Sequence, residues 1–126
     1  MFINKYRKRQ SHKIWILEQL SDNGYDVKRT PKSWDKGADG IAIAPREGTK
    51  QSMIIQCKHT QTGKPINEKG ILEIVKAKKF YSQSDQELHP VVVSNAKRFS
   101  AKSIQLAKDK GVRLVTRNDL FDWFKS

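Results

Sequence analysis

The feature that most constrains the fold is the spacing of short apolar runs in the second half of the chain. Residues 90–94 include three successive valines, which is typical of a buried strand. Helical patterns flank this run, and a second strand pattern follows at residues 112–116. Strands that alternate with helices usually pair in parallel, through crossover connections. The sequence therefore predicts a sheet that is at least partly parallel and is covered by helices.

The first half of the chain predicts one helix and a meander of three strands. Gly24 ends the first helix, and Asn67, Ser100 and Asn118 are the predicted N-caps of the later helices. The expected helices cover residues 6–23, 67–82, 100–110 and a short segment after 118, and the expected strands cover residues 25–30, 41–44, 52–58, 90–94 and 112–116. The predicted fold is an α/β/α sandwich with a central mixed β-sheet, in one domain over residues 1–126.

Charge, cysteine content and hydropathy limit the classes of binding partner and of cellular compartment. The chain has 25 basic and 13 acidic residues, a net charge of +12, which favours nucleic acid as a polyanionic partner, although a membrane-surface or acidic-protein binder is also compatible with this charge. A single cysteine excludes an internal disulfide and a cysteine-rich zinc site. No apolar run reaches the roughly 18–20 residues of a membrane span, and no signal-peptide pattern is present, so we expect a cytoplasmic protein that does not bind membranes.

Three polar residues are predicted to converge at one end of the sheet. Asp39 lies where a polar loop enters the 41–44 strand, and Gln56 and Lys58 lie two residues apart on the next strand. Because side chains alternate along a strand, Gln56 and Lys58 share one face and Cys57 points to the other. In an antiparallel hairpin the end of the second strand lies beside the start of the first. We therefore expect Asp39 to come close to Gln56 and Lys58.

This grouping predicts phosphodiester chemistry. Asp39, the side-chain oxygen of Gln56 and the backbone carbonyl of Cys57 are suitable ligands for a hard cation, Mg²⁺ or Mn²⁺. Lys58 would orient or deprotonate the attacking water, or stabilise the transition state. Simpler interpretations remain open, because Asp39 before Gly40 is also common in turns and Lys58 can be a solvated strand-end charge.

Two segments carry a resemblance to a known family. Residues 37–42 (GADGIA) and 54–58 (IIQCK) resemble the two halves of the PD-(D/E)xK nuclease signature. Glutamine in place of the second acid resembles the Mrr-type restriction endonuclease branch, and residues 91–100 (VVVSNAKRFS) are similar to the strand, turn and helix cap of that branch. The resemblance covers roughly residues 14–124. It implies a restriction-endonuclease-like fold and a Mg²⁺- or Mn²⁺-dependent DNA endonuclease.

The chain departs from this pattern in two places. The family often has a glutamate in the first helix as a further metal ligand, and that position falls near Lys13 and Ile14 here. Either Glu18, one turn after Ile14, substitutes for this glutamate, or the ligand is absent. Gln56 also removes one negative charge from the motif, so a degenerate site that does not cleave is a second interpretation.

Further residues are candidate contacts to nucleic acid. Trp34 either packs over the hairpin or stacks on a base, and His59 follows the predicted catalytic lysine. The full set of candidate DNA contacts is Arg7, Lys8, Arg9, Trp34, Lys36, His59, Lys97 and Arg98.

Several functions are compatible with this pattern. The leading prediction is an Mrr-like DNA endonuclease. The alternatives are a Holliday-junction-type resolvase, a non-catalytic DNA-binding module with a degenerate nuclease site and, less favoured, an RNA-binding or RNA-cleaving domain. We expect a homodimer because cutting both strands needs two sites, and the chain can also be one domain of a larger protein.

Overall fold

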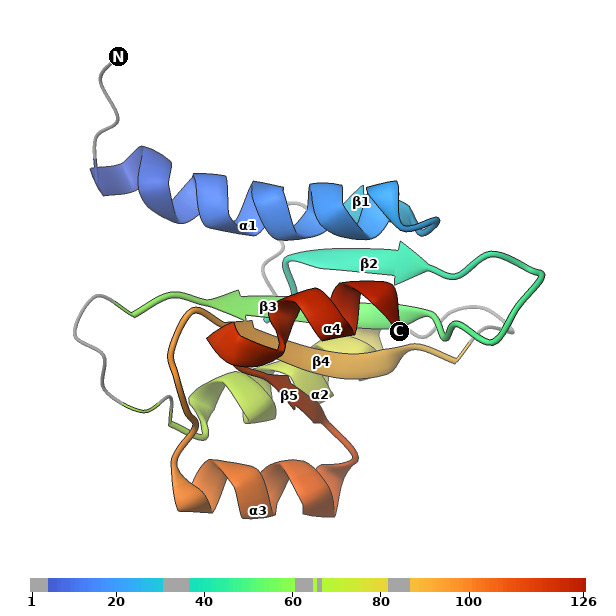
Figure 1. Ribbon diagram of the computed structural model, residues 1–126. Coiled ribbons are helices and arrows are strands. Elements are labelled where there is room, and N and C mark those ends of the chain that lie inside the picture. Colours follow the sequence, from blue (N-terminus) through green and yellow to red (C-terminus); the bar gives the residue numbers. More distant parts are fainter. Residues whose placement is uncertain (1–4, 31–36, 61–64, 66, 82–86) are drawn as a thin grey trace.

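A computed structural model describes residues 5–30, 37–60, 65, 67–81 and 87–126, with side chains from residue 12 onward (Figure 1). Its elements are α1 (Lys5–Asp22), β1 (Asp26–Arg29), β2 (Gly40–Ile43), β3 (Met53–Lys58), α2 (Lys69–Tyr81), β4 (His89–Ser94), α3 (Ala101–Lys110), β5 (Arg113–Val115), the 3₁₀ turn η2 (Arg117–Asp119) and α4 (Leu120–Lys125).

The five strands form one mixed sheet in the order β1-β2-β3-β4-β5. β1, β2 and β3 pair antiparallel, whereas β3, β4 and β5 pair in parallel. The meander and the two parallel crossovers predicted from the sequence are thus confirmed.

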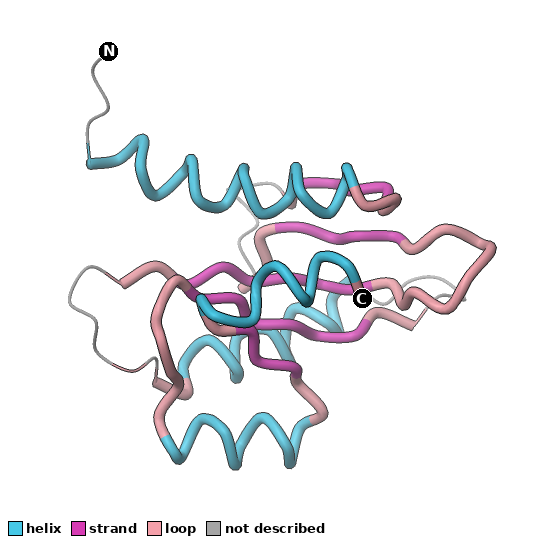
Figure 2. The backbone as a smooth tube through the Cα atoms, in the orientation of Figure 1, coloured by secondary structure: helices cyan, strands magenta, loops and turns pink. Residues whose placement is uncertain are grey.

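Helices cover both faces of the sheet, which forms a single layer between them (Figure 2). Alternating side chains of the strands divide the core in two. Ile55 and Val93 pack toward α1 and α4, in a cluster that includes Ile16 and Trp123. The other face packs against α2 and α3, in a cluster that includes Ile54, Val92, Ile71 and Ala107. This α/β/α arrangement confirms the predicted fold class.

The predicted helix boundaries are largely confirmed. Ser100 Oγ accepts the backbone N–H of Ser103 at 3.1 Å, and Gly111 adopts the left-handed conformation that ends α3. The prediction that Asn118 caps the last helix is wrong, because Asn118 lies inside η2. Asp119 is the N-cap residue of α4, and Thr116 is the N-cap residue of the preceding turn η2, with its hydroxyl donating to the Asp119 carboxylate at 2.7 Å.

The register places several loops at one end of the sheet. Lys58 at the end of β3 pairs with Ser94 at the end of β4, and Gly40 at the start of β2 pairs with Ile55. Asn95 joins the loops after β3 and β4, because its side-chain amide accepts from Thr60 N–H at 2.8 Å and donates to the Thr60 carbonyl at 2.9 Å. We call the end of the sheet at which β3 and β4 finish, at Lys58 and Ser94, the C-terminal end of β3 and β4.

Candidate active site

Asp39 is held firmly at the C-terminal end of β3 and β4. Its backbone N–H donates to the Ile55 carbonyl at 2.7 Å, and its carbonyl accepts from Thr30 N–H at 3.2 Å. Its carboxylate oxygen Oδ2 accepts the backbone N–H of Cys57 at 2.7 Å. Cys57 is the residue between Gln56 and Lys58, so the carboxylate lies against the strand segment that carries both.

Gly37 holds the loop before Asp39 against α2. Its φ of 91° is unfavourable for other residues, and a Cβ there would lie 2.6 Å from Glu73 Cβ and 2.7 Å from the Glu73 carbonyl oxygen. Glycine is therefore required both for the turn and for the close approach to the helix.

We expect Gly37→Ala to lower the free energy of unfolding by about 2–4 kcal/mol, the sum of backbone strain and overlap with α2. The matched control is Gly48→Ala, which has a similar φ of 110° but no atom within 4 Å of the added Cβ. This control should cost only about 1 kcal/mol of backbone strain. Urea denaturation measures both, and equal losses would contradict the role of the contact with Glu73.

Lys13 is a member of the site for which the sequence predicted no role. Its ammonium lies 2.6 Å from Oδ1 of Asp39, and the side chains are 27% and 13% exposed, respectively. Lys13 lies on α1, where the resemblance led us to expect an acid. The sequence carried one signal for this contact, since Lys13 occupies the helical position that the family pattern assigns to the site.

Gln56 and Lys58 share the α2 face of β3, as predicted, and both contact Glu73. Gln56 Nε2 donates to Glu73 Oε2 at 2.6 Å, and Lys58 Nζ lies 3.4 Å from the same oxygen. Glu73 was not predicted as a site residue. The available signal was its place between Ile71 and Ile74, two buried residues of α2.

The other side-chain oxygen of Gln56 lacks a partner among the described residues. Gln56 is only 5% exposed, and its Oε1 is buried without a hydrogen bond. Gly70 flanks this oxygen, since a Cβ there would lie 3.2 Å from Oε1 and 2.9 Å from Lys58 Cε. A buried, unpartnered amide oxygen normally costs stability, which makes it a candidate ligand atom.

The donor atoms of these residues are of the chemical type that Mg²⁺ binds. Mg²⁺ commonly takes one or two carboxylates, keeps several waters and binds substrate phosphates, and Asp39, Glu73 and Gln56 Oε1 supply oxygens of that kind. Among the described residues, no group of three or more His, Cys, Asp or Glu side chains is placed to hold a metal ion.

Cys57 serves packing rather than nucleophilic chemistry. Its side chain faces the core beside α1 and α4. Burial raises the pKa of the Cys57 thiol, and the nearby Asp39 carboxylate raises it further. The thiol therefore stays protonated at physiological pH.

Two histidines lie beside the site. The rings of His12 on α1 and His59 after β3 make an edge-to-face contact with centroids 5.8 Å apart. Burial lowers the pKa of His12, and the nearby His59 lowers it further, so His12 is uncharged near neutral pH. The contact places the predicted DNA-binding residue His59 next to the α1 segment that carries Lys13.

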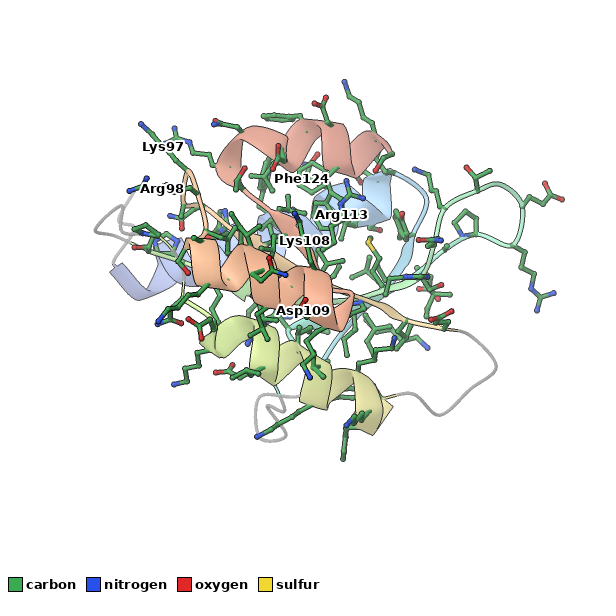
Figure 3. All side chains as sticks on the ribbon, turned by 90° about the horizontal axis from the view of Figure 1, so that it is seen from below. Lys97, Arg98, Lys108, Asp109, Arg113 and Phe124 are labelled. Atoms are coloured by element: carbon green, nitrogen blue, oxygen red, sulfur yellow. The ribbon has the colours of Figure 1, made fainter. Side chains whose placement is uncertain are left out.

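Lys97 and Arg98 lie in the loop after β4, at the same end of the sheet as Lys58. Both are exposed and project outward beyond α3 (Figure 3). With Phe99 and Ile104 they border a groove of about 350 Å³. Their position is compatible with the predicted phosphate contacts.

Other predicted site residues lie elsewhere or outside the described part of the chain. Glu18 is exposed and borders a shallow pocket with Val27 and Arg29, while Lys13 is the α1 residue that contacts Asp39. The role of Glu18 as a ligand stays a prediction. Trp34 and Lys36 lie outside the described residues, as do the side chains of Arg7, Lys8 and Arg9.

Comparison with protein families places this site in a known context. The model of the Mrr catalytic domain, described as a restriction endonuclease, matches residues 9–124. This chain belongs to the Mrr restriction endonuclease family. The match includes both halves of the motif and the segment from β4 to α4, so the resemblance inferred from the sequence is confirmed at the level of the family.

Solved structures support the same fold for this Mrr-family chain. The crystal structure of VC1899 from Vibrio cholerae has a TM-score of 0.61 at 15% identity, with 99% of this chain and 35% of that chain covered. The crystal structure of AF1548, a protein of unknown function, has a TM-score of 0.60 at 16% identity, with 83% and 56% covered. The chain thus spans about a third to a half of these neighbours.

Two further comparisons are negative. No curated protein matches the sequence significantly. Among the described residues, no helix has the length and apolar character needed to cross a membrane.

Proposed function

We propose that this Mrr-family chain is a divalent-metal-dependent endodeoxyribonuclease. Asp39, Gln56 and Lys58 form the proposed active site, at which phosphodiester bonds are hydrolysed. The observation that carries the proposal is the buried, unpartnered Oε1 of Gln56, in a strand segment whose backbone also anchors the Asp39 carboxylate. A cation ligand would satisfy this oxygen.

Asp39 and Gln56 are the proposed cation ligands, with Glu73 and the Cys57 carbonyl as further oxygens. A bound Mg²⁺ or Mn²⁺ would acidify water and offset charge on the scissile phosphate. Hydrogen bonds within the chain position the proposed ligands: the Cys57 N–H fixes the Asp39 carboxylate, and Glu73 orients the amide of Gln56.

Lys58 is the proposed transition-state residue. Its side chain is partly exposed, and its ammonium lies 3.4 Å from the Glu73 oxygen that also accepts from Gln56. A compact point charge there can orient the attacking water and stabilise charge that develops on the phosphate.

DNA is the proposed substrate, and a homodimer is the proposed active form for cutting both strands. The net charge of +12 and the location of Lys97 and Arg98 at the C-terminal end of β3 and β4 support a polyanion at this site.

We expect DNA affinity to fall steeply with salt, with a log–log slope of roughly −5 for a protein that neutralises six phosphates. Changing Lys97 and Arg98 together to alanine should make the slope shallower by about 2 without altering sequence preference. The charge-matched control is Lys79→Ala with Lys110→Ala, at the far ends of α2 and α3. Fluorescence anisotropy in EDTA measures both slopes, and equal slopes for the two double variants would contradict the phosphate contacts.

Gln56→Glu restores the more common motif acid but should destabilise the metal-free protein. The new carboxylate would replace a donor that lies 2.6 Å from Glu73 Oε2, so two like charges would meet. We expect a loss of about 1.5–3 kcal/mol without metal, the scale of a charge-assisted hydrogen bond, and recovery with Mn²⁺. Thermal unfolding with and without Mn²⁺ measures this, and a loss that Mn²⁺ leaves unchanged would argue against a cation beside Gln56.

A substrate panel tests the proposed activity. The purified chain is incubated with Mg²⁺ or Mn²⁺ and linear duplex, supercoiled plasmid, single strands or a four-way junction. Cleavage of plain duplex supports the general endonuclease. Paired nicks restricted to the junction would indicate a resolvase instead, and no cleavage of any substrate would contradict the proposal.

A non-catalytic DNA-binding module is the second candidate, and one observation favours it. Each of the two carboxylates at the site is paired with a lysine, Asp39 with Lys13 and Glu73 with Lys58. Tight DNA binding without cleavage in either metal would select this function.

A further inference from the structure

The charges of the candidate site balance without any added ion. Asp39 and Glu73 each carry one negative charge, Lys13 and Lys58 each carry one positive charge, and Gln56 is neutral. Their formal sum is zero. A divalent cation that approaches the two carboxylates therefore meets two ammonium groups that already neutralise them.

The two side chains of the Lys13–Asp39 pair differ in how tightly they are held in place. Asp39 is fixed by three backbone hydrogen bonds, to Ile55, Thr30 and Cys57, and its side chain is 13% exposed. Lys13 is 27% exposed and carries its ammonium on a flexible four-carbon stem. When the pair separates, Lys13 is thus the partner that moves.

DNA would offer Lys13 another anionic partner. Lys13 lies on α1 next to His12, and the His12–His59 contact holds this helix segment beside the end of β3. A phosphate drawn to that end of the sheet can therefore accept the ammonium of Lys13. The carboxylate of Asp39 would then become free.

We infer that Lys13 is a displaceable internal counter-ion that blocks cation binding at Asp39 until a DNA phosphate takes it over. This inference rests on the proposed metal-dependent function of the site. Binding of DNA and of the cation would then strengthen each other, because each favours separation of Lys13 from Asp39.

The test measures two affinities of the full chain separately, for Mn²⁺ alone and for a short duplex in EDTA. Lys13→Met keeps most of the stem and removes the charge. It should tighten Mn²⁺ binding about tenfold, within the usual range of coupling between sites, and should weaken DNA binding. Lys13→Gln should act in the same way, and Lys13→Arg should keep Mn²⁺ affinity near that of the wild type. Calorimetry and anisotropy provide the readouts, and thermal unfolding checks that each variant is folded.

The matched control is Lys79→Met, which removes the same charge near the end of α2 and should leave Mn²⁺ affinity unchanged. One outcome would overturn the inference and retain the proposed site: Mn²⁺ affinity is unchanged in Lys13→Met and Lys13→Gln but is lost in Asp39→Asn. Unchanged DNA affinity of both Lys13 variants would overturn the transfer of Lys13 to phosphate. Wild-type Mn²⁺ affinity in Asp39→Asn would overturn the proposed site and the inference together.

Discussion

Asp39→Asn is expected to lower DNA cleavage by at least about 10²-fold, the scale for removing a major electrostatic contribution to catalysis. Asparagine keeps an oxygen that can accept the Cys57 N–H, so the substitution removes the charge and preserves the anchor. DNA affinity in EDTA should be retained or should rise by no more than a few-fold, because Lys13 loses its partner and is then free to bind phosphate. Single-turnover cleavage and anisotropy measure the two effects.

The matched control for this substitution is Asp109→Asn. Asp109 is an exposed acid near the C-terminal end of α3 (Figure 3), and its carboxylate accepts from Gln105. Its loss should leave the cleavage rate unchanged. Wild-type cleavage by Asp39→Asn would show that Asp39 is not a ligand and would remove the basis of the proposed site.

Lys58→Met is expected to lower kcat by about 10² or more, the usual effect of losing one acid–base or electrostatic group. KM for DNA should change little, because the proposed role of Lys58 is in the transition state. Lys58→Arg should restore activity only in part, since a planar guanidinium that stays charged cannot act as a base or occupy the same point. Steady-state kinetics on a duplex separate kcat from KM.

Lys79→Met serves again as the charge-matched control and should cleave like the wild type. A lysine that only held Glu73 in place would give a different result, because Lys58→Arg would then preserve the ion pair and restore full kcat. Full activity of Lys58→Met, in a preparation shown free of contaminating nuclease, would exclude Lys58 from catalysis.

The sequence was sufficient for those parts of the fold that depend on local patterns. The alternation in β3 places Gln56 and Lys58 on one face because side chains of a strand alternate with a period of two. Ser100 and Gly111 mark the limits of α3 through backbone hydrogen bonding and conformation within a few residues. The start of the last helix was predicted less well, since Asn118 and Asp119 are both acceptable caps and only the path of the chain through η2 after β5 selects Asp119.

The sequence also predicted which strands carry the residues of the candidate site. The motif residues lie on neighbouring strands of a hairpin, so strand pairing alone brings Asp39 to the backbone of Cys57. The tertiary structure decided which side chains on the helices pair with these residues. Glu73 reaches Gln56 and Lys58 because α2 docks on one face of the sheet, and Lys13 reaches Asp39 because α1 docks on the other. The position of a helix across a sheet is set by the packing of its entire apolar face. The sequence therefore marks Lys13 and Glu73 only by their positions on a helix and does not identify the carboxylate or lysine that each will meet.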